Sequence, residues 1–296
     1  MATFSRLQKI SILSLGAIGG SLAYYHNLGK SEHKYIVRNS WTTNYTPSVK
    51  WDKNWDHREP ERIMKPPKSD NPEDDNRYNE QIKKSKSKAV RHLFLIRHGQ
   101  CSLDSVTDNE RILTELGRHQ ADLTGKRLAL LDIKWDLLVS STMARAQETA
   151  KIIAKHLPND IELKDCQLIE EGVPNIPEPK EYWTHEPRVY QDNARIEAAF
   201  QRYFHRAPPD QTQDSYTLIV GHLNVIRFFV CRALQFPPEA WLRMSLNNGS
   251  ITWISIKPSG NVILRSLNDT GHLDPQDITI QNQHPEPEKL KVVQQS

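Results

Sequence analysis

Residues 92–100 read His-Leu-Phe-Leu-Ile-Arg-His-Gly-Gln. The mostly apolar run 92–96 predicts a short buried strand, and an arginine, a histidine and a glycine follow at its carboxyl end. Further strands are predicted at 135–139 and 216–220, and a helical pattern follows each of them. Because strands that alternate with helices form sheets covered on both faces, the sequence predicts an α/β fold: a single three-layer domain with a mostly parallel sheet.

The remaining predicted elements complete this domain. Thr114 is the expected N-cap of a helix at 115–130, and Ser141 or Thr142 is expected to cap a second helix at 144–156. The other expected elements are a helix at about 224–234 and two strands, at 250–256 and 262–267, around the turn Pro258-Ser259-Gly260.

Composition limits the possible functions. Apolar residues make up 37% of the 296 residues, which is low for a wholly globular chain, so part of the length is expected to be tail or linker. The net charge of +3 gives no support to nucleic-acid binding. Three widely spaced cysteines, Cys101, Cys166 and Cys231, argue against a disulfide framework or a structural zinc site. We expect a chain without a metal or another cofactor.

The N-terminal segment differs from the rest of the chain. Residues 1–31 contain no Asp or Glu, and two basic residues precede an apolar run at 10–25. As a helix this run spans about 25 Å, which is short but workable for a bilayer core. We expect 1–31 to be a membrane anchor with mitochondrial targeting character; a secretory signal peptide and a buried core helix are the alternatives. A polar linker at 32–90, a folded domain at 91–273 and a polar tail at 274–296 are expected to follow.

One island in this linker is aromatic: residues 51–56 read Trp-Asp-Lys-Asn-Trp-Asp. Trp51 and Trp55 are four residues apart, so in a helical turn both project from one side. Such large side chains in a polar segment expose costly apolar area unless they dock on something. They either pack on their own domain or dock on a neighbouring subunit, and the second alternative predicts a homo-oligomer.

Histidines and arginines gather at three predicted strand ends. Arg97 and His98 end the first strand, Arg145 lies at the start of the helix after the second, and His222 follows the strand at 216–220. Ligands of open α/β sheets bind outside the carboxyl ends of the strands, where helix N-termini also favour anions. Because guanidinium groups match phosphate oxygens in bidentate fashion, the pattern predicts a phosphate pocket.

A histidine in this pocket can act as a nucleophile. Neutral imidazole is available near neutral pH and forms a labile phosphoryl adduct, so His98 would split hydrolysis of a phosphate ester into two easier steps. The surrounding cations would stabilise the transferring phosphoryl group. The leaving alkoxide needs a proton, which Glu170 or Glu171 can supply, since adjacent like charges raise the pKa of at least one carboxyl.

Four motifs resemble the histidine phosphatase (phosphoglycerate mutase-like) superfamily, over about residues 91–267. They are Leu95-Ile96-Arg97-His98-Gly99-Gln100, Leu113-Thr114-Glu115-Leu116-Gly117, Ser140-Ser141 through Arg145-Ala146 to Glu148-Thr149, and Gly221-His222 with Asn224. The resemblance implies that His98 is the phosphorylated nucleophile and that Glu171 is the acid. It also implies that the phosphoryl group is bound by Arg97, Arg145 and His222, the last of which takes part in catalysis.

A narrower resemblance, to the mitochondrial protein-phosphatase branch of this superfamily, covers about residues 51–267. It rests on the 51–56 motif and on the runs 172–174, 193–200, 224–227, 231–238 and 245–252. It implies a serine/threonine-specific protein phosphatase without mutase activity, held in a mitochondrial membrane, with the outer membrane favoured. The implied partners are phosphoproteins, including stress-signalling kinases of the apoptosis-signal-regulating type, and further copies of the chain, joined through Trp51, Asp52, Asn54, Trp55 and Asp56.

Two positions depart from the pattern of that branch. Gly99 is often Ser there, and Leu223 stands where Ala is common, at the expected mouth of the pocket.

Three other functions compete with a protein phosphatase. A phosphoglycerate mutase is disfavoured because residues 170–175 lack the Asn-Glu-Arg-His-Tyr-Gly segment in which mutases carry the acid. A small-molecule phosphomonoesterase is the second alternative. A membrane-tethered scaffold that binds phosphoproteins is the third, and the presence of every expected catalytic residue argues against an inert site.

Overall fold

The computed structural model describes residues 50–67, 71–103, 107, 111–158, 160–181, 184 and 186–280. The chain from Trp51 onward forms one compact unit. The expected anchor at 1–31 lies outside the described residues. Within the described ranges, no helix combines the length and the apolar character needed to cross a membrane.

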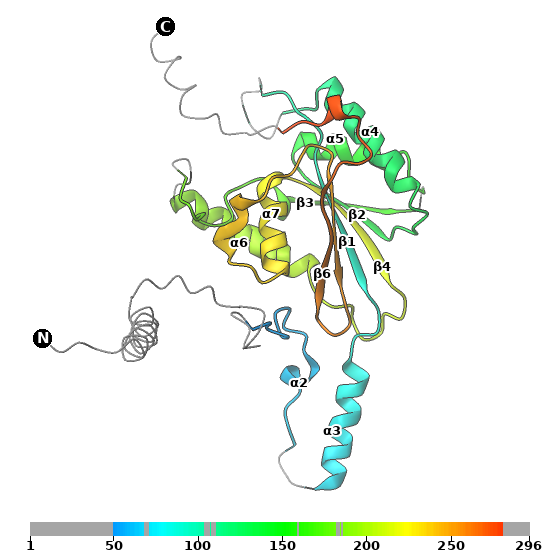
Figure 1. The fold of residues 1–296 in the computed structure, drawn as a ribbon. Helices are drawn as coiled ribbons and strands as arrows, with labels where there is room; N and C mark the ends of the chain where they lie inside the picture. The colour runs from blue at the N-terminus through cyan, green and yellow to red at the C-terminus, as the bar shows by residue number, and fades with distance from the viewer. Residues whose placement is uncertain are drawn as a thin grey trace, which may run out of the picture. The chain divides into compact units, whose positions relative to one another are not determined.

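Six strands form one sheet in the order β3-β2-β4-β1-β5-β6 (Figure 1). Neighbouring strands are parallel from β3 to β1, whereas β5 is antiparallel to both β1 and β6. The strands are β1 (Arg91–Arg97), β2 (Leu137–Ser141), β3 (Glu162–Cys166), β4 (Ser215–Gly221), β5 (Ile251–Ile256) and β6 (Val262–Asp269). The predicted α/β fold with a mostly parallel sheet is confirmed.

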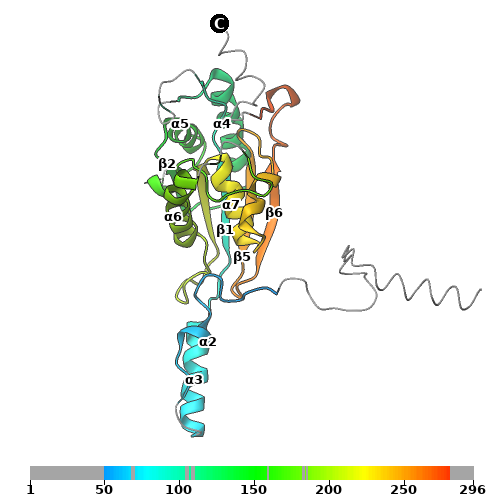
Figure 2. The same ribbon diagram turned by 90° about the vertical axis from the view of Figure 1, so that its left-hand side faces the viewer.

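Helices cover both faces of this sheet, and the side chains of β1 alternate between the two layers. Leu93 and Leu95 belong to the hydrophobic core that includes residues of α6 and α7, whereas Phe94 and Ile96 pack in the core beside α4 and α5. Figure 2 shows α7 in front of β1 and β5. The helices are α4 (Glu115–Ala129), α5 (Ala144–Ala154), α6 (Glu186–Tyr203) and α7 (Leu223–Ala233). Burial on both faces explains why β1 reads as a nearly continuous apolar run.

Strand register brings the predicted site residues to one edge of the sheet. In the parallel pair of β1 and β4, Arg97 lies opposite Gly221, so the residues that follow them, His98 and His222, leave the sheet side by side. In the parallel pair of β2 and β4, Ser140 lies opposite Val220, and α5 begins a few residues later. Three strands therefore end at the same place.

Several elements differ from the sequence predictions. Neither β3 nor α6 was predicted, and β2 begins at Leu137, two residues later than expected. Part of the segment that the sequence predicts to be polar linker forms a helix, α3 (Pro72–Ser85). Asn71 caps this helix by accepting a hydrogen bond from the Glu73 N–H at 3.1 Å. Acidic residues in its first turn and lysines in its last turn suit the helix dipole. The short elements are α2 (Pro60–Ile63), η2 (Gln167–Ile169), η3 (Pro238–Arg243) and η4 (Pro275–Asp277).

One predicted helix cap is confirmed and the other is wrong. Thr114 caps α4, because its Oγ1 accepts from the Gly117 N–H at 3.0 Å. The N-cap of α5 is Met143, which makes no side-chain capping bond. Ser141 lies too early for that role, and its hydroxyl instead contacts the Met143 N–H and His222.

The predicted C-terminal tail begins with an ordered strap. Residues 274–280 lie against α4, where Gln120 Nε2 donates to Asp277 O at 2.6 Å and to Thr279 Oγ1 at 2.9 Å. The Asn248 N–H donates to Thr279 O at 3.0 Å. The rest of the tail, 281–296, lies outside the described residues.

Candidate active site

The structure brings together the four basic residues that the sequence places at strand ends. His98 follows β1, His222 is the N-cap of α7 after β4, and their ring centroids are 5.2 Å apart. Arg145 lies in the first turn of α5, and Arg97 ends β1. Each of the four is at most 1% exposed. Positive charges that are buried this completely need negative partners, which makes the cluster a candidate site for an anion.

Hydrogen bonds fix the orientation and the tautomer of His98. Its Nδ1 lies 2.7 Å from Gly99 O, which can only accept, so Nδ1 carries the proton. Its Nε2 therefore keeps a lone pair and accepts from Arg145 Nε at 3.2 Å. The nitrogen with the free electron pair thus faces the guanidinium that would bind a phosphoryl oxygen.

The same surroundings keep His98 neutral. Burial lowers the pKa of His98 well below its usual value, and the positive charges of Arg145 and Arg97 lower it further. The hydrogen bond to Gly99 opposes this shift only in part. A neutral imidazole at pH 7 is the form that can act as a nucleophile.

Arg97 remains a cation in spite of its burial. Burial lowers its pKa to about 10, while the nearby carboxylate of Glu171 raises it. Its Nη1 donates to Leu246 O at 2.5 Å, which anchors one side of the guanidinium. Arg97 therefore stays charged at neutral pH.

His222 presents the opposite ring nitrogen to the site. Its Nε2 lies 2.8 Å from Ser141 Oγ, and that oxygen also accepts from the Met143 N–H at 3.3 Å. The Ser141 hydroxyl can donate to Nε2, and in that arrangement the imidazole proton of His222 lies on Nδ1. Nδ1 is buried and has no hydrogen-bond partner among the described residues. His222 can thus donate to a phosphoryl oxygen, while His98 attacks phosphorus.

The two neighbouring glutamates point in different directions. Glu170 Oε1 accepts a hydrogen bond from the exposed Thr142 hydroxyl. Glu171 is half-buried and accepts from the backbone N–H groups of Gly172 at 3.1 Å and Asn224 at 3.4 Å. Burial raises the pKa of Glu171, and the opposing charge of Arg145 offsets part of the rise. Glu171 is the glutamate that shares the site with the arginines.

Close backbone packing holds the loop after β1 in place. A Cβ atom on Gly99 would lie 2.3 Å from Gly117 O, and one on Gly117 would lie 1.9 Å from Gln100 O. The Gly99 N–H donates to Thr149 Oγ1 at 3.1 Å, and Asn248 Nδ2 donates to His98 O at 3.1 Å. Glycine at position 99 is therefore a packing requirement of this chain.

Arg227 is a functional candidate that the sequence prediction missed. It is 8% exposed, donates through Nη1 to Asn224 Oδ1 at 3.5 Å, and has no partner for Nε among the described residues. Burial lowers its pKa to about 10, and the charge of Glu171 raises it. An arginine in the middle of the mostly apolar helix α7 was the available signal. Leu223 was expected at the pocket mouth, but it is 7% exposed and packs in the core beside α6, because the first turn of α7 turns it inward.

The motif at 51–56 lies on its own domain. Trp55 Nε1 donates to Gly260 O at 2.8 Å, and its ring lies 5.9 Å from that of Phe200. Asp56 forms a buried ion pair with Arg206 at 2.7 Å. Trp51 is half-buried, and its Nε1 lacks a hydrogen-bond partner within the described chain. The backbone of Asp52 exchanges two hydrogen bonds with the Gln235 amide, and Asn54 Oδ1 accepts from the Glu59 N–H.

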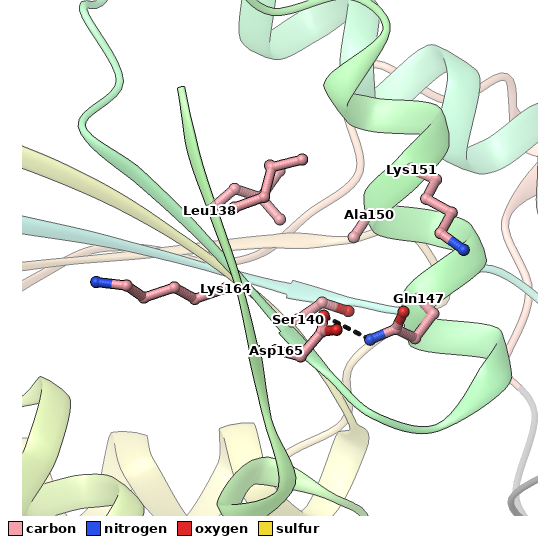
Figure 3. A pocket seen from close by; sticks show the side chains of 8 residues that line it. Leu138, Ser140, Gln147, Ala150, Lys151, Lys164 and Asp165 are labelled. Atoms are coloured by element: carbon pink, nitrogen blue, oxygen red, sulfur yellow. Dashed lines mark hydrogen bonds between the residues drawn. The ribbon is translucent and has the colours of Figure 1, made fainter. Parts of the chain in front are cut away.

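A hollow of about 210 Å³ lies elsewhere, between α5 and strands β2 and β3 (Figure 3). Lys151, Lys164 and Leu163 are among the residues that line it, and Gln147 Nε2 donates to Asp165 Oδ1 at 2.6 Å across it. None of the predicted site residues lines this hollow. In the part of the chain that the structure describes, no group of three or more His, Cys, Asp or Glu side chains could hold a metal ion.

Comparison with known proteins adds independent information. The model of the histidine phosphatase superfamily (branch 1) matches residues 93–270. The "Serine/threonine-protein phosphatase Pgam5, mitochondrial" of Drosophila pseudoobscura pseudoobscura is 50% identical over 274 residues, which cover 90% of this chain and 94% of that protein. The protein of the same name from Drosophila willistoni is 48% identical over 280 residues, which cover 92% of this chain and 96% of that protein. A crystal structure of phosphoglycerate mutase from Plasmodium falciparum is 34% identical, with a TM-score of 0.44, and covers 61% of this chain and 91% of that chain.

Proposed function

Because the chain belongs to the histidine phosphatase superfamily, and within it to the family of the mitochondrial serine/threonine-protein phosphatases named above, we propose that it hydrolyses phosphoserine and phosphothreonine in proteins through a phosphohistidine at His98. One observation carries the proposal: a buried, neutral His98 whose unprotonated Nε2 faces Arg145. A nucleophile beside fixed cations is what phosphoryl transfer requires.

In the first step His98 Nε2 attacks phosphorus. The new N–P bond forms as the P–O bond to the serine oxygen breaks, and that oxygen takes a proton from the carboxylic acid of Glu171. Arg97, Arg145 and the Nδ1–H of His222 neutralise the charge on the phosphoryl oxygens during transfer. The dephosphorylated protein leaves with its hydroxyl restored.

In the second step water attacks the phosphohistidine. The carboxylate of Glu171 takes a proton from the attacking water, the N–P bond breaks, and its electron pair returns to His98 Nε2. Inorganic phosphate leaves, and both residues regain their starting protonation states. A group that gives a proton in one step and takes one in the next suits a carboxyl whose pKa is raised by burial.

Two further expectations belong to the same proposal. The mitochondrial names of the relatives support a mitochondrial location, and the apolar run at 10–25 supports an anchor in a mitochondrial membrane, with the outer membrane favoured. Stress-signalling kinases of the apoptosis-signal-regulating type are the proposed substrates. A small-molecule phosphomonoesterase and a scaffold that binds phosphoproteins are the alternatives.

The 51–56 motif is also proposed to join copies of the chain. Trp51 supports this role, since part of its large apolar side chain stays exposed on its own domain. We expect Trp51→Ala to lower the oligomer mass in light scattering, and Trp55→Ala to lower the free energy of unfolding, because Trp55 packs on its own domain. An unchanged mass after deletion of 51–56 would refute the role.

Hydrolysis assays test the catalytic proposal. Purified full-length protein should release phosphate from phosphoserine and phosphothreonine peptides, and His98→Asn should lower kcat by roughly a thousandfold or more. Assaying 3-phosphoglycerate in parallel addresses the mutase alternative, for which we expect no isomerisation. Isomerisation without peptide hydrolysis would overturn the proposed function.

A further inference from the structure

We propose that Asp192 and Arg195 of α6 are positioning residues for Glu171. They hold the backbone of the loop that carries this carboxyl, and so fix the carboxyl where proton transfer takes place. The inference rests on the acid role proposed for Glu171 and deepens it, because it names what keeps the acid in place.

Arg195 binds several carbonyls of this loop at once. Its Nη1 donates to Leu168 O at 3.0 Å and to Glu170 O at 2.7 Å, and its Nη2 donates to Glu171 O at 3.3 Å. A weaker contact reaches Gln167 O at 3.4 Å. The rigid fork of a guanidinium suits such multiple bonding, which the single point charge of a lysine cannot reproduce.

Asp192 lies on the same helix and holds the same loop, and we refer to Asp192 and Arg195 together as the clamp. Its Oδ1 accepts from Arg195 Nη2 at 3.0 Å, and its Oδ2 accepts from the Val173 N–H at 2.8 Å. The side chains of the pair are 16% and 21% exposed, so these bonds are largely sheltered from water. Together the two side chains hold the backbone on both sides of Glu171.

Gly172 shows how closely the loop lies on the pair. A Cβ atom at this position would come 2.5 Å from Asp192 Cγ and 2.7 Å from Arg195 Nη2. From the other side, Asn224 Nδ2 donates to Gly172 O at 3.1 Å. The loop is thus held between α6 and the first turn of α7, where the Asn224 N–H contacts the Glu171 carboxylate itself.

The clamp has a consequence that a purely structural ion pair would not have. A serine alkoxide leaves readily only if it is protonated, whereas p-nitrophenolate is stable without a proton. If the clamp acts through Glu171, loss of the clamp should slow cleavage of phosphoserine much more than cleavage of p-nitrophenyl phosphate. A general loss of folding or phosphate binding would slow both substrates.

The test compares kcat/KM for these two substrates in the full-length protein. For Arg195→Gln we expect a loss of roughly 10- to 100-fold on a phosphoserine peptide and a change of less than about threefold on p-nitrophenyl phosphate. Arg195→Lys should lose less. Arg232→Gln is the matched control, because Arg232 of α7 likewise forms an ion pair with an acidic residue of α6, Glu197 at 2.8 Å, but is not bonded to the loop. It should leave both values unchanged.

A double variant separates this inference from the proposed function. Glu171→Gln should show the same substrate selectivity, and adding Arg195→Gln to it should cause no further loss on the phosphoserine peptide, since the clamp acts only through Glu171. Equal losses on both substrates, or additive losses in the double variant, would overturn the clamp while leaving the acid role intact. Wild-type protein inactive on the peptide would overturn the proposed function and the clamp together, whereas a Glu171→Gln variant without selectivity would overturn the acid role of Glu171 and the clamp.

Discussion

His98 and His222 show how the partner of one ring nitrogen decides the use of the other. The backbone carbonyl of Gly99 leaves His98 with a free electron pair, and a hydroxyl of Ser141 that donates to His222 Nε2 leaves His222 with a free donor at Nδ1. The positions of both histidines could be predicted, because each follows an apolar strand. Their tautomers could not, since Ser141 reaches His222 only through the pairing of β2 with β4.

The residues alone likewise could not decide whether Glu170 or Glu171 is the acid. Both lie after η2, in backbone without regular structure, where no hydrophobic period indicates which side chain points inward. The resemblance to the superfamily names Glu171, and the geometry places that carboxyl at the N-terminus of α7.

A matched pair of substitutions tests this choice. Glu171→Gln should lower kcat/KM for a phosphothreonine peptide by roughly 10²- to 10⁴-fold, the usual contribution of a positioned acid. Glu170→Gln should change it by less than about threefold, because Glu170 contacts the exposed Thr142. Steady-state kinetics at pH 7 measure both, and the reverse ranking would assign the acid to Glu170.

Among the elements, β1 and α4 meet through two glycines. The loop after His98 passes so close to the first turn of α4 that neither Gly99 nor Gly117 has room for a side chain. The N-cap bond from Gly117 to Thr114 fixes this turn. Helix α4 therefore supports the nucleophile although it contributes no catalytic group.

Substitution of Gly117 tests this support. In Gly117→Ala the new methyl group would overlap Gln100 O, so the loop after His98 must shift, and we expect kcat to fall by roughly 10- to 100-fold. Gly221→Ala is the control, since a Cβ there meets nothing closer than 3.9 Å. Kinetics and thermal unfolding of both variants check the prediction, and a Gly117→Ala variant with wild-type kcat would contradict it.

Elements were predictable where burial produced a pattern. The strands β1 and β4 read as apolar runs because helices cover both faces. Strand β3 gave no such signal, since four of its five residues are exposed at the sheet edge. Helix α3 is rich in charge and buries only Ile82, so its sequence reads as linker, although Asn71 and Pro72 form a typical helix start.

At the scale of the whole molecule, burial of histidines links stability to pH. Burial lowers the pKa of His92, His98, His205, His222 and His272. Each of these rings binds a proton near pH 6.5 in the unfolded chain but not yet in the folded one. As the pH falls below 6.5, the unfolded chain takes up more protons, and the free energy of unfolding decreases.

Denaturant unfolding at two pH values tests this linkage. The free energy of unfolding should be lower at pH 5 than at pH 7. Burial lowers the pKa of His205 to about 4, so this residue alone accounts for about 3 kcal/mol at most, lost between pH 6.5 and about 4. His205→Asn should therefore weaken the pH dependence. Equal stability at pH 5 and pH 7 would contradict the linkage.

The central claim is that phosphate passes through His98, and trapping the intermediate tests it most directly. Full-length protein is mixed with a phosphoserine peptide, quenched in alkali, digested and analysed by mass spectrometry. We predict an acid-labile, base-stable phosphate on the fragment that contains His98, absent from His98→Asn. Turnover without this adduct, or a phosphate on a different residue, would contradict the account.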